Sequence, residues 1–129
     1  MKLNPKITQI FVVIIGIIHV SLAFVEIFFA AFFLQTRFCF PAEIAIQAEP
    51  IVKNAGIYNS FIAAGLLWSA FDTTNQKPLR IFFLVCVIVA GIFGAITLKP
   101  TTLIIQTIPA LIALVLVWKT KADSTEPAL

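Results

Sequence analysis

Four long runs of apolar residues dominate this chain of 129 residues, and they cover approximately positions 7–34, 51–71, 81–98 and 101–118. As a helix with a rise of about 1.5 Å per residue, each run is long enough to cross a hydrocarbon layer of about 30 Å. The chain is 60% apolar and only 12% charged, so it has too little polar surface to cover a water-soluble core. The sequence therefore predicts an all-α polytopic membrane protein, a bundle of four transmembrane helices.

The domain organisation follows from these runs. We expect a single transmembrane domain over residues 1–118 and a flexible cytoplasmic tail over residues 119–129. The first run, of about 28 residues, must tilt, protrude or fray at one end. A cleaved signal peptide is the competing interpretation of its start, but the run exceeds a usual signal core and no small-residue cleavage site follows it. Pro50 suits the first turn of a helix, so we expect the second helix to begin close to that residue.

Positive charges in the loops predict the orientation in the membrane. With four spans both termini lie on one side, and that side collects six Lys and Arg residues against three on the other. Both termini are therefore expected to be cytoplasmic. Trp68 and Trp118 then fall at cytoplasmic helix ends, where indole rings favour the interface. The formal charge of +3 is too small to indicate a nucleic-acid partner, so the expected partner is the lipid bilayer.

The first apolar run carries two polar residues, His19 and Glu26, seven positions apart. Seven residues make two helical turns, so these side chains differ by only about 20° in azimuth and share one face. Small residues fall on the same face, at Gly16, Ala23 and Ala30. Because small and polar residues in a membrane turn toward other helices, we expect this stripe to face the bundle interior. The phenylalanines of the run, Phe24, Phe28, Phe29 and Phe32, are then expected to meet lipid.

The second and fourth runs carry matching polar groups. Asn54 and Tyr58 form an i, i+4 pair beside Asn59, next to a ridge of small residues at Gly56, Ser60 and Ala64. In the fourth run Gln106 shares a face with Ala110 and Ala113, and Pro109 frees a carbonyl one turn earlier, which predicts a kink. The third run offers only a packing surface of small residues, at Ala90, Gly91, Gly94 and Ala95.

Depth along the helices groups these residues into one site. Counted at 1.5 Å per residue from the outer ends, Asn54 lies about 6 Å deep, Gln106 about 8 Å, and Glu26, Tyr58 and Asn59 about 12 to 13 Å. His19 lies about 10 Å below Glu26. The pattern predicts a funnel that opens outward, with His19 near its floor and the outer loop of residues 37–50 available to cover it. The candidate ligand-binding or proton-linked residues are His19, Glu26, Asn54, Tyr58, Asn59 and Gln106.

Structural roles compete with this interpretation. Asn59 and Gln106 could simply join helices by hydrogen bonds, Tyr58 could belong to the outer aromatic belt, and His19 could be satisfied by a backbone carbonyl. Glu26 is harder to explain structurally, because a carboxyl group at that depth must be protonated, paired or facing water. Two groups about 10 Å apart cannot share one ion, so no metal site is predicted, and the sequence identifies no cofactor.

The chain resembles the family of small bacterial four-helix membrane proteins catalogued as domain of unknown function 1304, at the segments HVSLAFVEIFF, NAGIYNSFIAAGLLW, FFLVCVIVAGIFGAITLK and IQTIPALIALVL. The most specific part is the N-x-G-x-Y-N pattern of residues 54–59, in which Ala55 stands where the family more often has Gln. The resemblance implies the four-helix architecture, a place in the bacterial cytoplasmic (inner) membrane, and polar residues at the six candidate positions. The family carries no established activity, so the resemblance implies no mechanism.

Three functions are consistent with the sequence. The first is binding or transport of a small amphipathic or cationic molecule, coupled to protonation of Glu26; transport would call for a homodimer, because four short helices scarcely enclose an alternating-access path. The second is a membrane-embedded enzyme acting on a lipid or isoprenoid-like substrate, with His19 or Glu26 as acid or base. The third is a non-catalytic accessory subunit. The sequence favours the first, because it shows no nucleophile paired with a base and no complete metal-ligand set.

Overall fold

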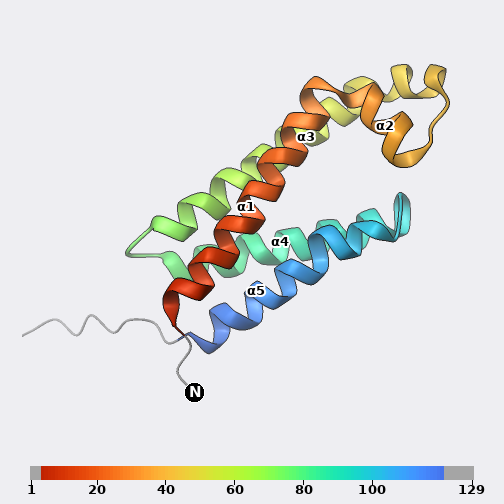
Figure 1. Ribbon diagram of the computed structural model, residues 1–129. Coiled ribbons are helices and arrows are strands. Elements are labelled where there is room, and N and C mark those ends of the chain that lie inside the picture. Colours follow the sequence, from red (N-terminus) through yellow and green to blue (C-terminus); the bar gives the residue numbers. More distant parts are fainter. Residues whose placement is uncertain (1–3, 121–129) are drawn as a thin grey trace, which may run out of the picture.

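The computed structural model describes residues 4–120, which are helical over most of their length and contain no strand (Figure 1). The elements are α1 (Pro5–Phe28), α2 (Ala30–Phe38), α3 (Ala42–Phe71), α4 (Gln76–Thr97), a π-helix η1 (Leu103–Thr107) and α5 (Ile108–Lys119). The predicted all-α class is therefore confirmed. Most of the predicted tail, residues 121–129, lies outside the described residues.

Two of these helices, α1 and α4, are long and apolar enough to cross a membrane. Helix α3 is longer than either, but Asn54, Tyr58 and Asn59 make it less apolar. The stretch Leu103–Lys119, which joins η1 to α5, is apolar but shorter. The structure thus supports a helical bundle with two candidate membrane spans.

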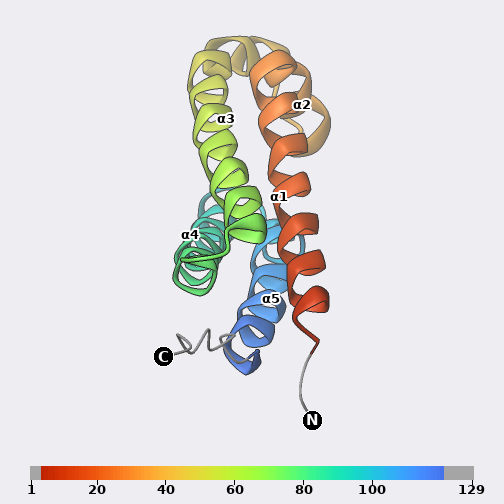
Figure 2. The ribbon, with the colours of Figure 1, turned by 90° about the vertical axis from the view of Figure 1, so that its left-hand side faces the viewer.

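The helices form two antiparallel pairs, α1 with α3 and α4 with α5 (Figures 1 and 2). All four meet at one end, which holds the start of α1 and the end of α5 and which we call the inner end. Toward the opposite, outer end the two pairs separate, and α2 turns from α1 toward the connection between α4 and η1. The short connection after α4 was expected to make α4 and α5 antiparallel neighbours, and they are.

The apolar core lies where the four helices meet. Small side chains let the helices approach closely, and the buried cluster consists of Val12, Ile15, Leu66, Ala70, Leu84, Val87, Ala110, Ala113 and Val117. The predicted inward stripe of the first run is confirmed, because Gly16, His19 and Ala23 on α1 and Ala30 on α2 are buried. The four phenylalanines expected to face lipid are all exposed, at Phe24, Phe28, Phe29 and Phe32.

Two helix boundaries differ from expectation. The first helix is not continuous to residue 34, because Phe29 leaves the helical conformation (φ −132°, ψ 29°) and separates α1 from α2. The second long helix begins at Ala42 and contains Pro50, so the expected start near Pro50 is wrong. Pro41, in extended conformation (φ −54°, ψ 145°), precedes the true start. The added first turns are held by packing, since Ala45 is fully buried.

Candidate functional site

A cavity of about 310 Å³ lies between the outer halves of the helices, and we call it the outer cavity. Helices α1, α2, α3, α4 and η1 all contribute to its wall. Most of the lining side chains are apolar. The polar ones are Glu26, Arg37, Asn59, Thr102 and Gln106. Three of the six candidate residues, Glu26, Asn59 and Gln106, are therefore brought together around one cavity.

Glu26 and Asn59 are in direct contact across the α1–α3 interface. The Asn59 side-chain amide Nδ2 donates a hydrogen bond of 2.7 Å to Glu26 Oε2. Both side chains are half-buried. The only ion pair among residues 4–120 joins Lys53 to Glu49, so Glu26 has no Lys or Arg partner within the described chain. Its carboxyl group is held by one neutral donor and faces the cavity.

Close approach of α1 and α3 makes this contact possible. A Cβ atom added at Gly56 would lie 3.0 Å from Glu26 Cβ and 3.1 Å from the backbone oxygen of Ala23. Only glycine leaves the two helices this close at residue 56. Asn59 lies three residues further along α3 and therefore projects on the same side, beside Glu26.

Gln106 reaches the cavity from the π-helix η1, where the Ile108 N–H bonds to the Leu103 oxygen five residues back. Pro109 has no N–H to offer the Ile105 carbonyl, which explains why regular α-helix gives way to a π turn here, whereas the kink expected at Pro109 stays a prediction. Gly91 on α4 accommodates the wider turn, since a Cβ atom there would lie 3.1 Å from Gln106 Cβ.

The sequence interpretation missed Arg37 as a cavity residue. Its Nη2 donates a 2.8 Å hydrogen bond to Thr101 Oγ1, and Lys99 Nζ donates to the Arg37 oxygen at 2.9 Å. These bonds attach the end of α2 to the connection after α4. Helical spacing could not have placed Arg37 reliably, because the break at Phe29 separates it from Glu26.

The other three candidates do not line the outer cavity. Tyr58 is 61% exposed and stacks edge-on against Phe61, with ring centroids 6.1 Å apart. Asn54 is also exposed. The inward face of α3 follows Gly56, Asn59 and Ala63, so the expected ridge through Ser60 and Ala64 is wrong, and with it the inward position of Tyr58.

His19 is buried below the cavity, and its Nδ1 lies 2.9 Å from the Ile15 backbone oxygen on the same helix. One ring nitrogen of His19 therefore has the backbone carbonyl partner that the alternative interpretation expected. Residues 4–120 contain no group of three or more His, Cys, Asp or Glu side chains close enough to hold a metal ion.

The fold and the cavity define a class of small all-α proteins with two helices long and apolar enough for a membrane. Within that class, the chain belongs to the family described as "Protein of unknown function (DUF1304)", which matches residues 13–118. The resemblance noted in the sequence is thus confirmed.

A curated relative is similar to this chain at 28% identity over 69 residues. It is described as "Uncharacterized protein YpaA" of Lactococcus lactis subsp. lactis (strain IL1403). The match covers 54% of this chain and 58% of the relative, so it spans little more than half of either protein. No solved structure matches the chain.

Proposed function

We propose that the chain is an integral protein of the bacterial cytoplasmic membrane with four transmembrane helices and both termini in the cytoplasm. Residues 1–118 would form the single transmembrane domain and residues 119–129 the tail. Large apolar side chains exposed on every long helix support this proposal, among them Phe24, Phe61, Phe93 and Ile112. An apolar surface this extensive favours contact with lipid over contact with water.

We further propose that the outer cavity binds a small amphipathic molecule and that binding is coupled to protonation of Glu26. The observation that carries the proposal is a carboxyl group that faces the outer cavity and has one neutral hydrogen-bond partner, Asn59. Such a group is stable in hydrocarbon when it is protonated, and stable when ionised if a cation or water accompanies it. A ligand that brings a positive charge would therefore displace the proton.

The wall of the cavity indicates the shape of the ligand. Glu26, Asn59 and Gln106 provide polar contacts, whereas Phe33, Leu34 and Ile105 provide apolar ones. A volume of about 310 Å³ is at the lower end for small-molecule sites. These features favour a compact molecule with one polar and one apolar end.

The cavity favours binding over catalysis. The hydrogen-bond partner of Glu26 is an amide, and His19 does not line the cavity, so the described residues place no base beside a nucleophile there. Transport in place of simple binding would require more helices around the path, and for that case we propose a homodimer.

The test uses benzyltrimethylammonium, a compact amphipathic cation, with neopentylbenzene as its uncharged isostere. Added to the purified full chain in weakly buffered detergent, the cation is expected to bind and release protons, and the isostere to release none. Glu26→Gln should abolish release, whereas Glu43→Gln, which changes an exposed carboxylate in the first turn of α3, should leave it intact. If Glu26→Gln only destabilises the fold while neither probe binds the wild type, the accessory-subunit interpretation replaces this one.

A further inference from the structure

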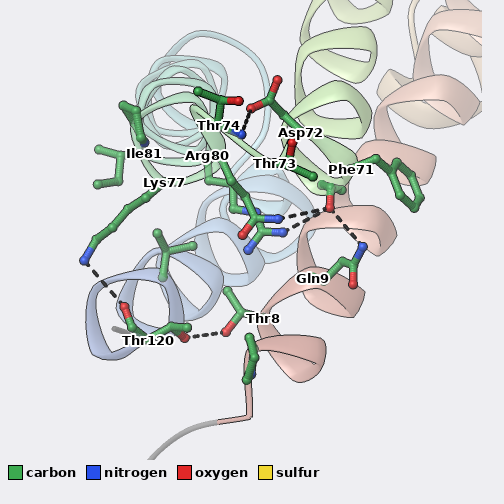
Figure 3. A pocket seen from close by; sticks show the side chains of 15 residues that line it. Thr8, Gln9, Phe71, Asp72, Thr73, Thr74, Lys77, Arg80, Ile81 and Thr120 are labelled. Atoms are coloured by element: carbon green, nitrogen blue, oxygen red, sulfur yellow. Dashed lines mark hydrogen bonds between the residues drawn. The ribbon is translucent and has the colours of Figure 1, made fainter. Parts of the chain in front are cut away.

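A second hollow, of about 760 Å³, lies at the inner end of the bundle, and we call it the inner pocket (Figure 3). It lies among the first turns of α1 and α4 and the last turns of α3 and α5. Its polar lining includes Thr8, Gln9, Lys77, Arg80 and Thr120. None of the six candidate residues lines it, so it is separate from the outer cavity.

Arg80 is the central charge of the inner pocket and is only 3% exposed. Its Nε donates to the Ser69 oxygen and its Nη2 to the Ala70 oxygen, both at 3.1 Å. Figure 3 shows the second of these contacts, which holds the guanidinium against the end of α3. Both acceptors are neutral, and no carboxylate among residues 4–120 pairs with Arg80. Because a buried cation without a counter-charge is costly, a bound anion would offset that cost.

A second cation of the inner pocket lies one helical turn before Arg80. Lys77 lies three residues earlier on α4, and its Nζ is 3.5 Å from the Thr120 oxygen, a contact long enough to be exchanged for a ligand. The hydroxyl groups of Thr8 and Thr120 lie 2.9 Å apart on the same wall, but Thr120 Oγ1 donates to the Leu116 oxygen and Thr8 donates to Thr120, so both hydroxyl hydrogens are already used.

One carboxylate, Asp72, also lines the inner pocket. Its Oδ1 accepts hydrogen bonds from the backbone N–H groups of Thr74 and Asn75, so these donors of the loop already stabilise its negative charge. Two cations, Lys77 and Arg80, remain against this single acid among the described lining residues. The inner pocket therefore has a positive excess.

We propose that the inner pocket binds an anionic phosphate group, with Arg80 and Lys77 as its cationic contacts. Phosphate oxygens accept several charge-assisted hydrogen bonds from Arg and Lys side chains. The pocket is larger than a phosphate ion requires, so it also accommodates a substituent. The phosphate could come from a phospholipid headgroup, since anionic lipids are enriched in the cytoplasmic leaflet, or from a phosphorylated solute.

The experiment titrates the full chain in detergent at constant ionic strength and follows its thermal unfolding midpoint. Three probes distinguish the sources: short-chain phosphatidylglycerol, which is anionic; short-chain phosphatidylcholine, which is zwitterionic; and inorganic phosphate. Lys77→Gln is the decisive variant, because Arg80 also holds the end of α3. Lys53→Gln is the matched control, since Lys53 lies on the outer half of α3 and does not line the inner pocket.

We expect phosphatidylglycerol to bind more tightly than phosphatidylcholine and Lys77→Gln to weaken its binding about tenfold. Lys53→Gln should change binding by less than about twofold. Phosphatidylglycerol binding alone identifies a lipid headgroup, whereas comparable binding of inorganic phosphate identifies a free phosphate. The proposal is overturned if neither anionic probe binds, or if Lys77→Gln binds them as tightly as the wild type.

Discussion

Asn59 Nδ2 donates a 2.7 Å hydrogen bond to Glu26 Oε2 and thereby joins α3 to α1 at the edge of the outer cavity. The bond crosses the interface beside Gly56, where the lack of a side chain lets the backbones of α1 and α3 approach each other near Glu26. It satisfies one oxygen of the carboxyl group and leaves the group able to respond to a ligand. The same pair of side chains therefore contributes both to the stability of the α1–α3 interface and to the proposed function.

Removal of Asn59 should destabilise the protein through Glu26. Asn59→Ala leaves a half-buried carboxyl group without its donor, which is expected to cost about 1–3 kcal/mol of unfolding free energy. The same substitution should cost much less in a Glu26→Leu background, which has no carboxyl oxygen left to satisfy, giving a coupling energy of at least about 0.5 kcal/mol in a double-mutant cycle. Asn54→Ala, at an exposed position of the same helix, is the control. Equal losses in both backgrounds would show that the two side chains act independently.

Gly56→Ala should weaken the α1–α3 interface. Replacement of glycine by alanine within a helix ordinarily adds about 1 kcal/mol of stability. Here the new Cβ atom would lie 2.8 Å from Ile27 Cγ1 and 3.1 Å from the Ala23 oxygen, so we expect a net loss of about 1–3 kcal/mol. Ala64→Ser, at an exposed site on the same helix, should stay within about 0.5 kcal/mol. A stabilised Gly56→Ala protein in urea or thermal unfolding would refute the close approach.

Thr107→Val should stabilise the protein. Thr107 Oγ1 is buried and has no hydrogen-bond partner among the described residues, and it lies against Gly91 of α4. Valine keeps the shape and removes the unpaired polar atom, for an expected gain of about 1 kcal/mol. Thr107→Ser, which retains the hydroxyl, should show no gain. A destabilised valine variant would indicate that the hydroxyl has a partner.

We expect the carboxyl group of Asp72 to contribute to the stability of the fold in a way that depends on pH. Hydrogen bonds from the backbone N–H groups of Asn75 and Thr74 lower the pKa of its carboxyl group in the folded state. The ionised form is thus favoured by folding, so its contribution is complete above the ordinary aspartate pKa of about 3.9 and is lost as the pH falls through the lowered value. The difference in unfolding midpoint between wild type and Asp72→Asn should therefore shrink below about pH 4. A difference in unfolding midpoint that grows toward acid pH would contradict a lowered pKa of Asp72 in the folded state.

The periodicity of the sequence was sufficient to predict the inward face of α1. Small and polar residues recur there with helical spacing, from Gly16 through His19 and Ala23 to Glu26, and the structure buries or half-buries each of them. Gln106 was also placed correctly, because it shares its face with the buried Ala110 and Ala113. In a long run with a regular pattern, the spacing of the residues along the sequence is enough to predict which face of the helix turns inward.

Features that depend on tertiary contacts were not predictable in the same way. Asn59 and Tyr58 are adjacent and both polar, and only the packing of α1 against Gly56 decides that Asn59 faces inward. The break at Phe29 has no Pro or Gly to mark it, and it brings α2 to the cavity wall. Pro50 looked like a helix start, but a helix tolerates the single lost hydrogen bond when the preceding turns are packed.

The number of protons released per bound benzyltrimethylammonium tests the central proposal most directly. Calorimetric titrations in two buffers of different ionisation enthalpy, repeated from about pH 5 to about pH 8, give this number from the full chain. We expect a maximum of about one proton per cation in the wild type and in Glu43→Gln, and none in Glu26→Gln. Binding by the wild type without proton release at any pH, or undiminished release from Glu26→Gln, would contradict a proton-linked site at Glu26.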